Sequence, residues 1–213
     1  MTKNFLIAIP VRDFVNPMSR LDKILSTSKR IELSKAMLLN IVESFKDDHV
    51  EIVCVSSDSL VKEFCNQNNI KIFSSTETGI NEELEDALNS IDYDFWTICH
   101  ADLPYINKFF ANEWINQCKQ SDIIICSSKD NGTPLLGGSK KVHHLYYGKN
   151  SFEKHIKMFQ EKNLDIKKSF NKEFSFEIDD EDDFIEFQKN TPRWFKGVST
   201  VSYTHLRAHE TNL

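Results

Sequence analysis

The sequence lacks the features that mark membrane, secreted or nucleic-acid-binding proteins. Its apolar runs are all shorter than the roughly 20 residues of a membrane-spanning helix, and its N-terminus shows no signal-peptide pattern. A basic surface is not indicated either, because the net charge at pH 7 is −6, whereas binding to nucleic acid phosphates favours an excess of Lys and Arg. We therefore expect a cytoplasmic protein whose partners include neither a membrane nor a nucleic acid.

Several short motifs are missing as well. The five cysteines are scattered without CxxC spacing, so we expect reduced, mostly buried thiols rather than a disulfide framework or a metal site. A chain of 213 residues can bury enough apolar surface to fold without cross-links. Neither a P-loop nor a GxGxxG fingerprint occurs, which argues against Walker-type and dinucleotide-binding sites. There is also no internal repeat.

What is present is an alternation of short apolar runs with helical patterns. The runs predict strands at 5–10, 51–56, 71–73, 95–99, 123–126 and 174–178. The helical patterns predict helices from the caps at 26–28 to residue 45, at 59–67, at 80–89, between 104 and 122, and at 151–162. Such alternation is typical of an α/β domain with a mostly parallel sheet. Glycines and short β-prone pieces at 131–147 interrupt it and predict a β-hairpin excursion.

The C-terminal segment does not continue this pattern. Residues 201–211 read VSYTHLRAHET, with neither a helical nor a strand period, and resemble the in-frame translation of a transposase sequencing adapter. We therefore expect one domain over 1–200, followed at 201–213 by an artefact or a natural disordered tail. If the segment is an artefact, the true C-terminus is missing, and the spacing of His205 and His209 does not indicate a metal site.

Two arginines follow the first predicted strand. Ligands of parallel α/β sheets bind beyond the carboxyl ends of the strands, which is where Arg12 and Arg20 are expected. A guanidinium offers forked donors to phosphate oxygens and keeps its charge. The alternative is that both side chains are simply solvated in a surface loop.

Carboxylates follow two later strands. Asp102 lies at the end of the run at 95–99, where a carboxylate can hold a hard cation such as Mg²⁺ or can instead cap a helix. In a strand at 174–178, alternation places Glu177 and Asp179 on one face, and two converging carboxylates repel unless a cation lies between them. The acidic residues at 180–183 fit a helix N-cap and first turn.

Loop residues supply candidate polar contacts. Thr133 and Gly148 lie in glycine-containing loops, where backbone N–H groups can approach an anion, and Ser151 is expected at a helix start. Turn formation alone also explains these residues. Asn81 either contacts a base edge or caps the helix that it opens, and His155 is interpreted as a packed or surface histidine.

Taken together, these motifs resemble one family, the guanylyltransferases of deazaflavin coenzyme F-420 biosynthesis that act on 2-phospho-L-lactate or phosphoenolpyruvate. The resemblance spans about residues 5–188 and keeps the family order. It rests on IPVR at 9–12 with SRL at 19–21, GIN at 79–81, ADLP at 101–104, NGTPLL at 131–136, YGKNSFEKH at 147–155 and EIDDEDDF at 177–184.

The resemblance implies a single-domain, Rossmann-like nucleotidyltransferase fold related to the GT-A glycosyltransferases. It further implies an enzyme that joins GTP to a small phosphorylated carboxylic acid and releases pyrophosphate, with a downstream transferase as a partner that consumes the labile product. The implied roles are Mg²⁺ binding by Asp102, Glu177 and Asp179, and phosphate binding by Arg12 and Arg20. The acceptor would contact Thr133, Gly148 and Ser151, and Asn81 would lie near the guanine.

Three residues depart from the family pattern. Arg12 stands in place of lysine, Met18 in place of a basic residue, and Glu177 in place of aspartate, and all three affect the expected site. The acceptor stays open among 2-phospho-L-lactate, phosphoenolpyruvate and 3-phospho-D-glycerate. The alternatives are another nucleotidyltransferase, a GT-A sugar transferase, or a catalytically inactive nucleotide-binding module.

Overall fold

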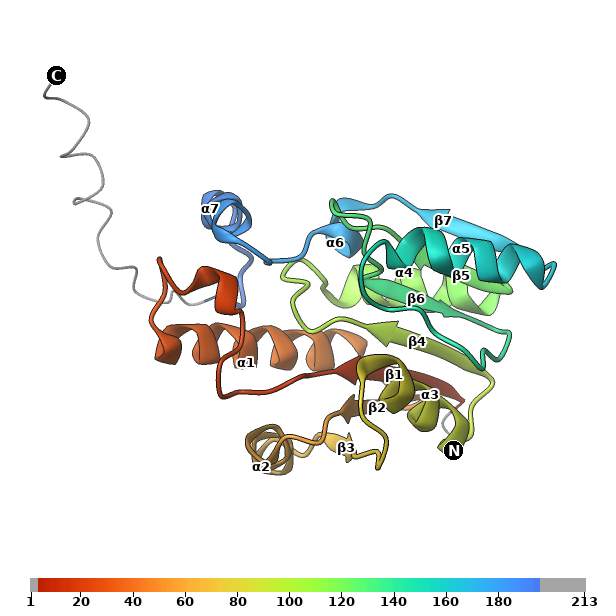
Figure 1. Cartoon of the computed structure of the whole chain (residues 1–213), viewed down its shortest axis with the longest axis horizontal. Coiled ribbons are helices and arrows are strands. Elements are labelled where there is room, and N and C mark those ends of the chain that lie inside the picture. Colours follow the sequence, from red (N-terminus) through yellow and green to blue (C-terminus); the bar gives the residue numbers. More distant parts are fainter. Residues whose placement is uncertain (1–3, 196–213) are drawn as a thin grey trace, which may run out of the picture.

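A seven-stranded sheet organises the chain (Figure 1). The structure, a computed structural model, describes residues 4–195, so the tail predicted at 201–213 lies outside the described residues. The strands are β1 (Phe5–Pro10), β2 (Val50–Val55), β3 (Lys71–Phe73), β4 (Phe95–Cys99), β5 (Ile123–Cys126), β6 (Leu135–Gly138) and β7 (Ile166–Ser169). The helices are the 3-10 turn η1 (Ser19–Leu21), α1 (Thr27–Phe45), α2 (Ser59–Gln67), α3 (Ile80–Ser90), α4 (Lys108–Lys119), α5 (Ser151–Glu161), α6 (Lys172–Ser175) and α7 (Glu181–Lys189).

The strand order is β3-β2-β1-β4-β6-β5-β7. Every pairing is parallel except those of β6, which runs antiparallel to both β4 and β5. The α/β class with a mostly parallel sheet is therefore confirmed. The hairpin expected at 131–147 is shifted, because β6 is the single strand that the structure describes in that range and it pairs with β5, which precedes the range. Because β6 is reversed, the residues just before it lie at the same edge as the carboxyl ends of the parallel strands.

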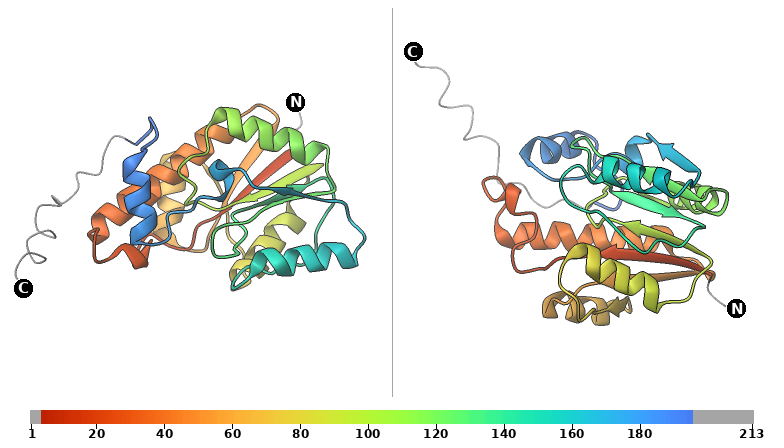
Figure 2. Two further views of the ribbon diagram at one scale, coloured as in Figure 1. Left: turned by 90° about the horizontal axis from the view of Figure 1, so that it is seen from above. Right: turned by 45° about the vertical axis from the view of Figure 1, so that its right-hand side comes forward.

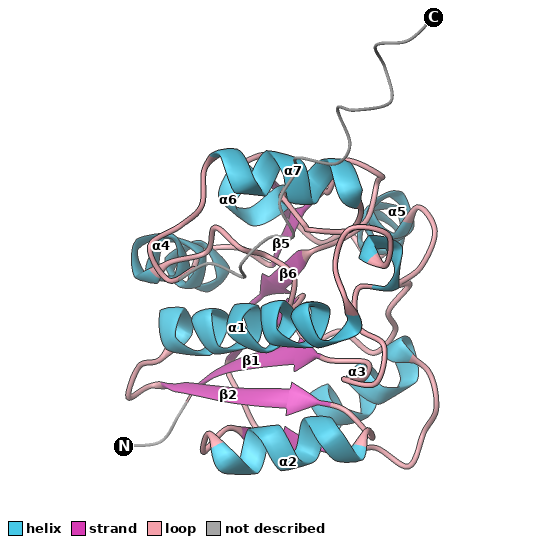
Figure 3. Cartoon of the chain, turned by 90° about the vertical axis from the view of Figure 1, so that its left-hand side faces the viewer, coloured by secondary structure: helices cyan, strands magenta, loops and turns pink. Residues whose placement is uncertain are grey.

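Helices cover both faces of the sheet, which Figures 2 and 3 show from further directions. The central strand β1 is buried on both sides because its side chains alternate between two cores. Phe5, Ile7 and Ile9 pack with α1, α2 and α4, whereas Leu6 and Ala8 pack with α3 and α5. Among residues 4–195, none of the helices is both long enough and apolar enough to span a membrane.

The helix starts follow the predicted caps. Ser26 is the N-cap of α1, and its Oγ accepts a hydrogen bond from the backbone N–H of Lys29. Asp180 is the N-cap of α7 and forms a reciprocal capping box with Asp183. The interpretation of residues 180–183 as a cap and an acidic first turn is thus confirmed.

The strand predicted at 174–178 is wrong. The seventh strand is β7, and the chain then forms α6, which is capped by Asn171, before an irregular segment leads to α7. Within residues 4–195 the strand β7 pairs with β5 alone, at the edge of the sheet. It exposes Lys167 and Lys168, so it lacks the apolar run of a buried strand. Phe174 supplied the apolar signal that misplaced the strand. Phe174 belongs to the helix α6 instead. Its side chain is fully buried, with the ring centroid 5.1 Å from that of Trp114.

A small third core joins the segment after β1 to the C-terminal part of the described chain. Leu21 of η1 and Leu33 of α1 pack against Ile178, Phe184 and Phe187. This core holds the acidic segment before α7 against the loop that follows β1.

Candidate active site

A cleft of about 770 Å³ opens at the carboxyl edge of the parallel strands. Its walls come from the loop after β1, the start of α3 and the end of β4, and its lining includes Arg12, Met18, Gly79 and Asp102. Within the sheet, β1 has β2 as its neighbour on one side and β4 as its neighbour on the other, so the strand order reverses direction at β1. This is the switch point at which open α/β sheets bind ligands.

The loop after β1 is held by a buried arginine that sequence reasoning missed. Arg30 of α1 is only 4% exposed. Its guanidinium donates to Asn16 Oδ1 and to the carbonyl of Pro17, each at 2.7 Å. The two arginines predicted as phosphate ligands are exposed, Arg12 in the cleft wall and Arg20 on η1. The loop therefore presents two exposed cations on a backbone that Arg30 holds in place.

Asp102 is oriented by the segment before α7. The backbone N–H of Ile178 donates to the carbonyl of Asp102 at 3.1 Å. Asp102 Oδ1 is buried and has no hydrogen-bond partner among the described residues. The alternative role as a helix cap does not apply, because the N-cap of α4 is Asn107. A buried acceptor without a donor is costly, which is the condition that a bound cation relieves.

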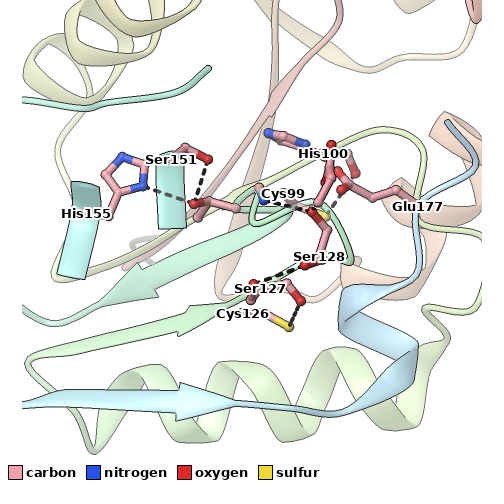
Figure 4. Close-up of polar contacts among 11 residues, drawn as sticks. Cys99, His100, Cys126, Ser127, Ser128, Ser151, His155 and Glu177 are labelled. Atoms are coloured by element: carbon pink, nitrogen blue, oxygen red, sulfur yellow. Dashed lines mark hydrogen bonds and ion pairs between the residues drawn. The ribbon is translucent and has the colours of Figure 1, made fainter. Parts of the chain in front are cut away.

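Glu177 belongs to two groups of side chains that could hold a metal ion. One group is His100, Asp102 and Glu177, and the other is Asp130, Glu177 and Asp179, with the ligand atoms of each group within 4.8 Å of one another. His100 Nδ1 lies 2.7 Å from Glu177 Oε1 (Figure 4). The structure thus brings the three predicted carboxylates to one place, with Glu177 between Asp102 and Asp179.

The charges in this cluster are not balanced within the described residues. Burial, and then the charge of Glu177, raise the pKa of Asp102 to about 7 and that of Asp179 to about 6. Burial opposes charge on His100, but its hydrogen bond to Glu177 and the nearby carboxylates outweigh burial and raise the pKa of the imidazole. Arg20 is close enough to Asp179 to act in the opposite direction on the pKa of that carboxyl.

A second polar group lies at the start of β6 and α5. Thr133 and Ser151 are buried, and their hydroxyl oxygens are 3.0 Å apart. Gly148 lies three residues before Ser151 with φ at +117°, and a Cβ added there would meet no heavy atom within 4 Å. The backbone at Gly148 is therefore open to close approach. The three residues predicted to bind the acceptor substrate therefore lie near the starts of β6 and α5, and the hydroxyl groups of Thr133 and Ser151 are in direct contact.

Asn81 has a different environment from the one expected of a free base-reading amide. Its Oδ1 accepts from the backbone N–H of Tyr147 at 2.6 Å, and its Nδ2 donates to the carbonyl of the same residue at 3.3 Å. The helix α3 has Gly79 as its N-cap, so Asn81 does not cap it. Both ends of the amide are engaged in holding the loop before α5.

Three further residues of the site were missed or undervalued. His100 directly follows β4, and its position beside the ADLP motif was the available signal. Asp130 joins the carboxylates from the turn before Thr133, and nothing in the local pattern distinguishes it from a turn residue. His155 is fully buried on α5 and bonded to Thr133, so it is a packed histidine with two polar contacts.

Comparison with known proteins decides the family. The guanylyl transferase CofC like family matches residues 5–208. The chain belongs to this family. It is accordingly a guanylyltransferase with a Rossmann-like nucleotidyltransferase fold, and the sequence resemblance is confirmed.

Relatives and solved structures agree with this assignment. The chain is 32% identical over 166 residues to the 2-phospho-L-lactate guanylyltransferase of Methanosphaera stadtmanae, covering 74% of this chain and 72% of that protein. It is 25% identical over 196 residues to the same enzyme of Archaeoglobus fulgidus, covering 90% and 84%.

Among solved structures, a nucleotidyl transferase of Methanothermobacter thermautotrophicus matches with a TM-score of 0.62 and 10% identity, covering 87% of this chain and 96% of that one. The 4-diphosphocytidyl-2C-methyl-D-erythritol synthase of Anaerococcus prevotii matches with a TM-score of 0.57 and 12% identity, covering 86% and 96%. At these identities the likeness concerns the fold alone.

Proposed function

We propose that this guanylyltransferase joins GTP to a small phosphorylated carboxylic acid in coenzyme F-420 biosynthesis. The acceptor is 2-phospho-L-lactate, phosphoenolpyruvate or 3-phospho-D-glycerate. An oxygen of its phosphate attacks the α-phosphorus of GTP, and a new phosphorus–oxygen bond forms. The bond to the β-phosphate breaks at the same phosphorus, and pyrophosphate leaves with the electron pair. The product is the guanylylated acid with a pyrophosphate linkage.

The observation that carries the proposal is the convergence of carboxylates beside the cleft. Asp102, Glu177 and Asp179 are oxygen ligands of the kind that Mg²⁺ prefers, and Oδ1 of Asp102, which has no hydrogen-bond partner within residues 4–195, fits a cation. Bound Mg²⁺ would supply Lewis-acid stabilisation of the charge on the phosphates. An acidic protein that binds a polyphosphate needs such a bridge between its carboxylates and its substrate.

The remaining roles are assigned to the chain's own residues. Arg12 and Arg20 would bind the triphosphate or the acceptor phosphate, because both are exposed cations at the carboxyl edge of the sheet. Thr133, Gly148 and Ser151 would bind the carboxylate and phosphate of the acceptor. Asn81 would lie near the guanine, and its hydrogen bonds to Tyr147 would fix the loop that carries Gly148.

The cellular setting is part of the same proposal. We place the protein in the cytoplasm, because its five cysteines are buried and free, as in reducing compartments. We also propose a downstream transferase as a partner, since the product is expected to be labile. An assay without that partner would register pyrophosphate but would lose the guanylylated acid.

The test is pyrophosphate release by the purified chain with GTP, Mg²⁺ and each of the three acceptors in turn. We expect acceptor-dependent release with GTP and much less with ATP, CTP or UTP. The presumed downstream transferase and its deazaflavin substrate are added in parallel to trap the product. No release with GTP and any acceptor, from a protein shown to be folded by circular dichroism, would refute the proposed function.

A further inference from the structure

A chain of buried hydrogen bonds runs behind the proposed acceptor site. The backbone N–H of Tyr146 donates to Nε2 of His155 at 2.9 Å. Nδ1 of His155 lies 3.1 Å from Oγ1 of Thr133, which lies 3.0 Å from Oγ of Ser151. Figure 4 shows His155 and Ser151 on either side of the hydroxyl that they share. His155 is 0% exposed, Thr133 1% and Ser151 2%, so the protein itself supplies the partners in these bonds.

The direction of this chain is fixed at its first bond. A backbone N–H can only donate, so Nε2 of His155 must be the unprotonated nitrogen. Burial lowers the pKa of His155 to about 4, and the imidazole is therefore neutral near pH 7. A neutral imidazole carries one proton, which must then be on Nδ1. Thr133 Oγ1 consequently accepts a hydrogen bond from His155.

The tautomer decides what the two hydroxyls can offer to a ligand. Thr133 and Ser151 together carry two hydroxyl protons, and the bond between them uses one. Because Nδ1 of His155 donates, the second proton is left for a ligand. In the opposite tautomer Thr133 would donate to His155 and Ser151 would donate to Thr133. Both protons would then be used, and the pair would turn only lone pairs toward an anion.

We propose that His155 is a positioning residue that keeps one hydroxyl proton of the Thr133–Ser151 pair available to the anionic acceptor. The inference rests on the proposed function, which places the carboxylate and phosphate of the acceptor at these residues. It adds a residue that does not touch the substrate and acts through Thr133. Gly148, whose backbone is open to close approach, and the positive end of α5 at Ser151 favour an anion in the same place.

The competing explanation is that His155 only fills space. Its ring lies 5.1 Å from that of Tyr147 and 6.2 Å from that of Phe159, so packing is substantial. Two substitutions separate the roles. His155→Phe keeps an aromatic ring and removes both hydrogen bonds, whereas His155→Asn loses the ring but places an amide N–H near the former position of Nδ1. A packing role predicts that Phe is tolerated better than Asn, and a hydrogen-bonding role predicts the reverse.

Steady-state kinetics tests the proposal in the intact chain. We expect His155→Phe to raise the KM for the acceptor about fivefold. The hydroxyl pair keeps a free proton without the imidazole, but it loses the donor that fixes the orientation of that proton, and a typical net hydrogen bond contributes ~1 kcal/mol. The KM for GTP should change less than about twofold. His155→Asn should recover most of the loss. Thermal unfolding of each variant checks that it is folded. An unchanged acceptor KM in His155→Phe, or equal rises in both KM values, would overturn the proposal.

A double-mutant cycle shows whether His155 acts through Thr133. Thr133→Val removes the hydroxyl and keeps the side-chain shape. We expect His155→Phe to have almost no further effect on the acceptor KM when Thr133 is already Val. Effects that simply multiply would contradict the proposed route.

A spectroscopic measurement separates this inference from the proposed function. The ¹⁵N chemical shifts of the imidazole in histidine-labelled wild-type protein, assigned with the His155→Phe spectrum, report which nitrogen carries the proton. We expect Nδ1–H. Finding Nε2–H overturns the inference even in an active enzyme. A wild-type protein with Nδ1–H but no turnover on any acceptor overturns the proposed function, and with it the acceptor role of the hydroxyl pair.

Discussion

The two polar regions at the carboxyl edge of the sheet differ in how far the protein satisfies its own groups. Among the described residues, the carboxylate region of His100, Asp102, Glu177 and Asp179 contains a buried carboxylate oxygen and a buried imidazole nitrogen without a hydrogen-bond partner, and two carboxyls with raised pKa values. The hydroxyl region of Thr133, Ser151 and His155 has a hydrogen bond at every buried polar atom.

This difference in hydrogen bonding indicates which region can gain stability from a ligand. Converging carboxylates oppose folding while they are charged, and either protons or a cation can neutralise them, so the first region stands to gain stability from a ligand. Neutral hydroxyls and a neutral imidazole stabilise the fold without any ligand, so the second region is preorganised. The two regions should therefore respond differently to mutation, pH and metal.

The largest effect is expected from Asp102→Ala in the carboxylate region. Loss of a metal-binding carboxylate should lower kcat/KM about 100-fold or more, because even residues behind the ligands change activity by ~10–100-fold. The measurement is pyrophosphate release with GTP and the preferred acceptor. Asp94→Ala is the matched control, since Asp94 is exposed just before the amino end of the same strand. Wild-type rates in Asp102→Ala would show that this region is not the catalytic one.

The same region gives the molecule a defined pH response. The folded pKa values of Asp102 and Asp179, about 7 and about 6, lie above the ordinary value of 3.8. The folded state therefore binds more protons than the unfolded state between these values. The stability that these groups contribute is full below about 3.8 and is lost as the pH rises through 6 to 7. His155 has the opposite sign: its folded pKa of about 4 lies below 6.5, so its contribution is lost as the pH falls.

Asp102→Asn should sharpen this contrast in the absence of metal. Removing one charge from the cluster should raise the free energy of unfolding at pH 8 by about 1 kcal/mol or more, since one pKa unit corresponds to ~1.4 kcal/mol. Near pH 5 the gain should nearly vanish. Urea unfolding in EDTA at both pH values measures it, with Asp94→Asn as control. Saturating Mg²⁺ should stabilise the wild type at pH 8 and not the variant. Equal effects at the two pH values would contradict repulsion as the cause.

The strands and helix caps that depend on local patterns could be predicted well from the sequence. The apolar run at Phe5–Pro10 and the cap at Ser26 each depend on a few adjacent residues, and both appear as expected. The strand β7 was not predicted, because an edge strand with exposed Lys167 and Lys168 buries too few apolar side chains to show an apolar pattern in the sequence. The strand predicted around Phe174 was wrong for a different reason, since a buried aromatic ring can belong to a helix as easily as to a strand.

The site residues that could be predicted are those that belong to a short sequence motif. Asp102, Glu177 and Asp179 were expected together, and the structure brings them together through the Ile178–Asp102 backbone hydrogen bond. Asp130 was not expected, because its place beside Glu177 depends on how two distant loops meet. The role argued for His155 depends on Thr133, 22 positions away, and on a backbone N–H of another loop. Side-chain spacing alone carries no such information.

An intermediate effect is expected in the hydroxyl region from Gly148→Ala. At φ of +117° a side chain is strained, which should cost about 1–2 kcal/mol of stability. Any shift of this backbone should also raise the acceptor KM more than the GTP KM. Unfolding and steady-state kinetics measure the two effects. Lys162→Ala, at the exposed carboxyl end of α5, is a control substitution away from the proposed acceptor site. A variant with wild-type stability and kinetics would show that this backbone is not constrained.

The smallest effect is expected from Met18→Lys, which adds charge to one region only. Met18 lines the cleft in the loop after β1, between the exposed cations Arg12 and Arg20 in the sequence. An added ammonium group should lower the KM for GTP about two- to threefold, as exposed ion pairs contribute ~0.2–1 kcal/mol. The gain should shrink at high salt, and the acceptor KM should stay unchanged. Met18→Gln keeps the length without the charge, so an equal gain in that variant would show that electrostatics is not the cause.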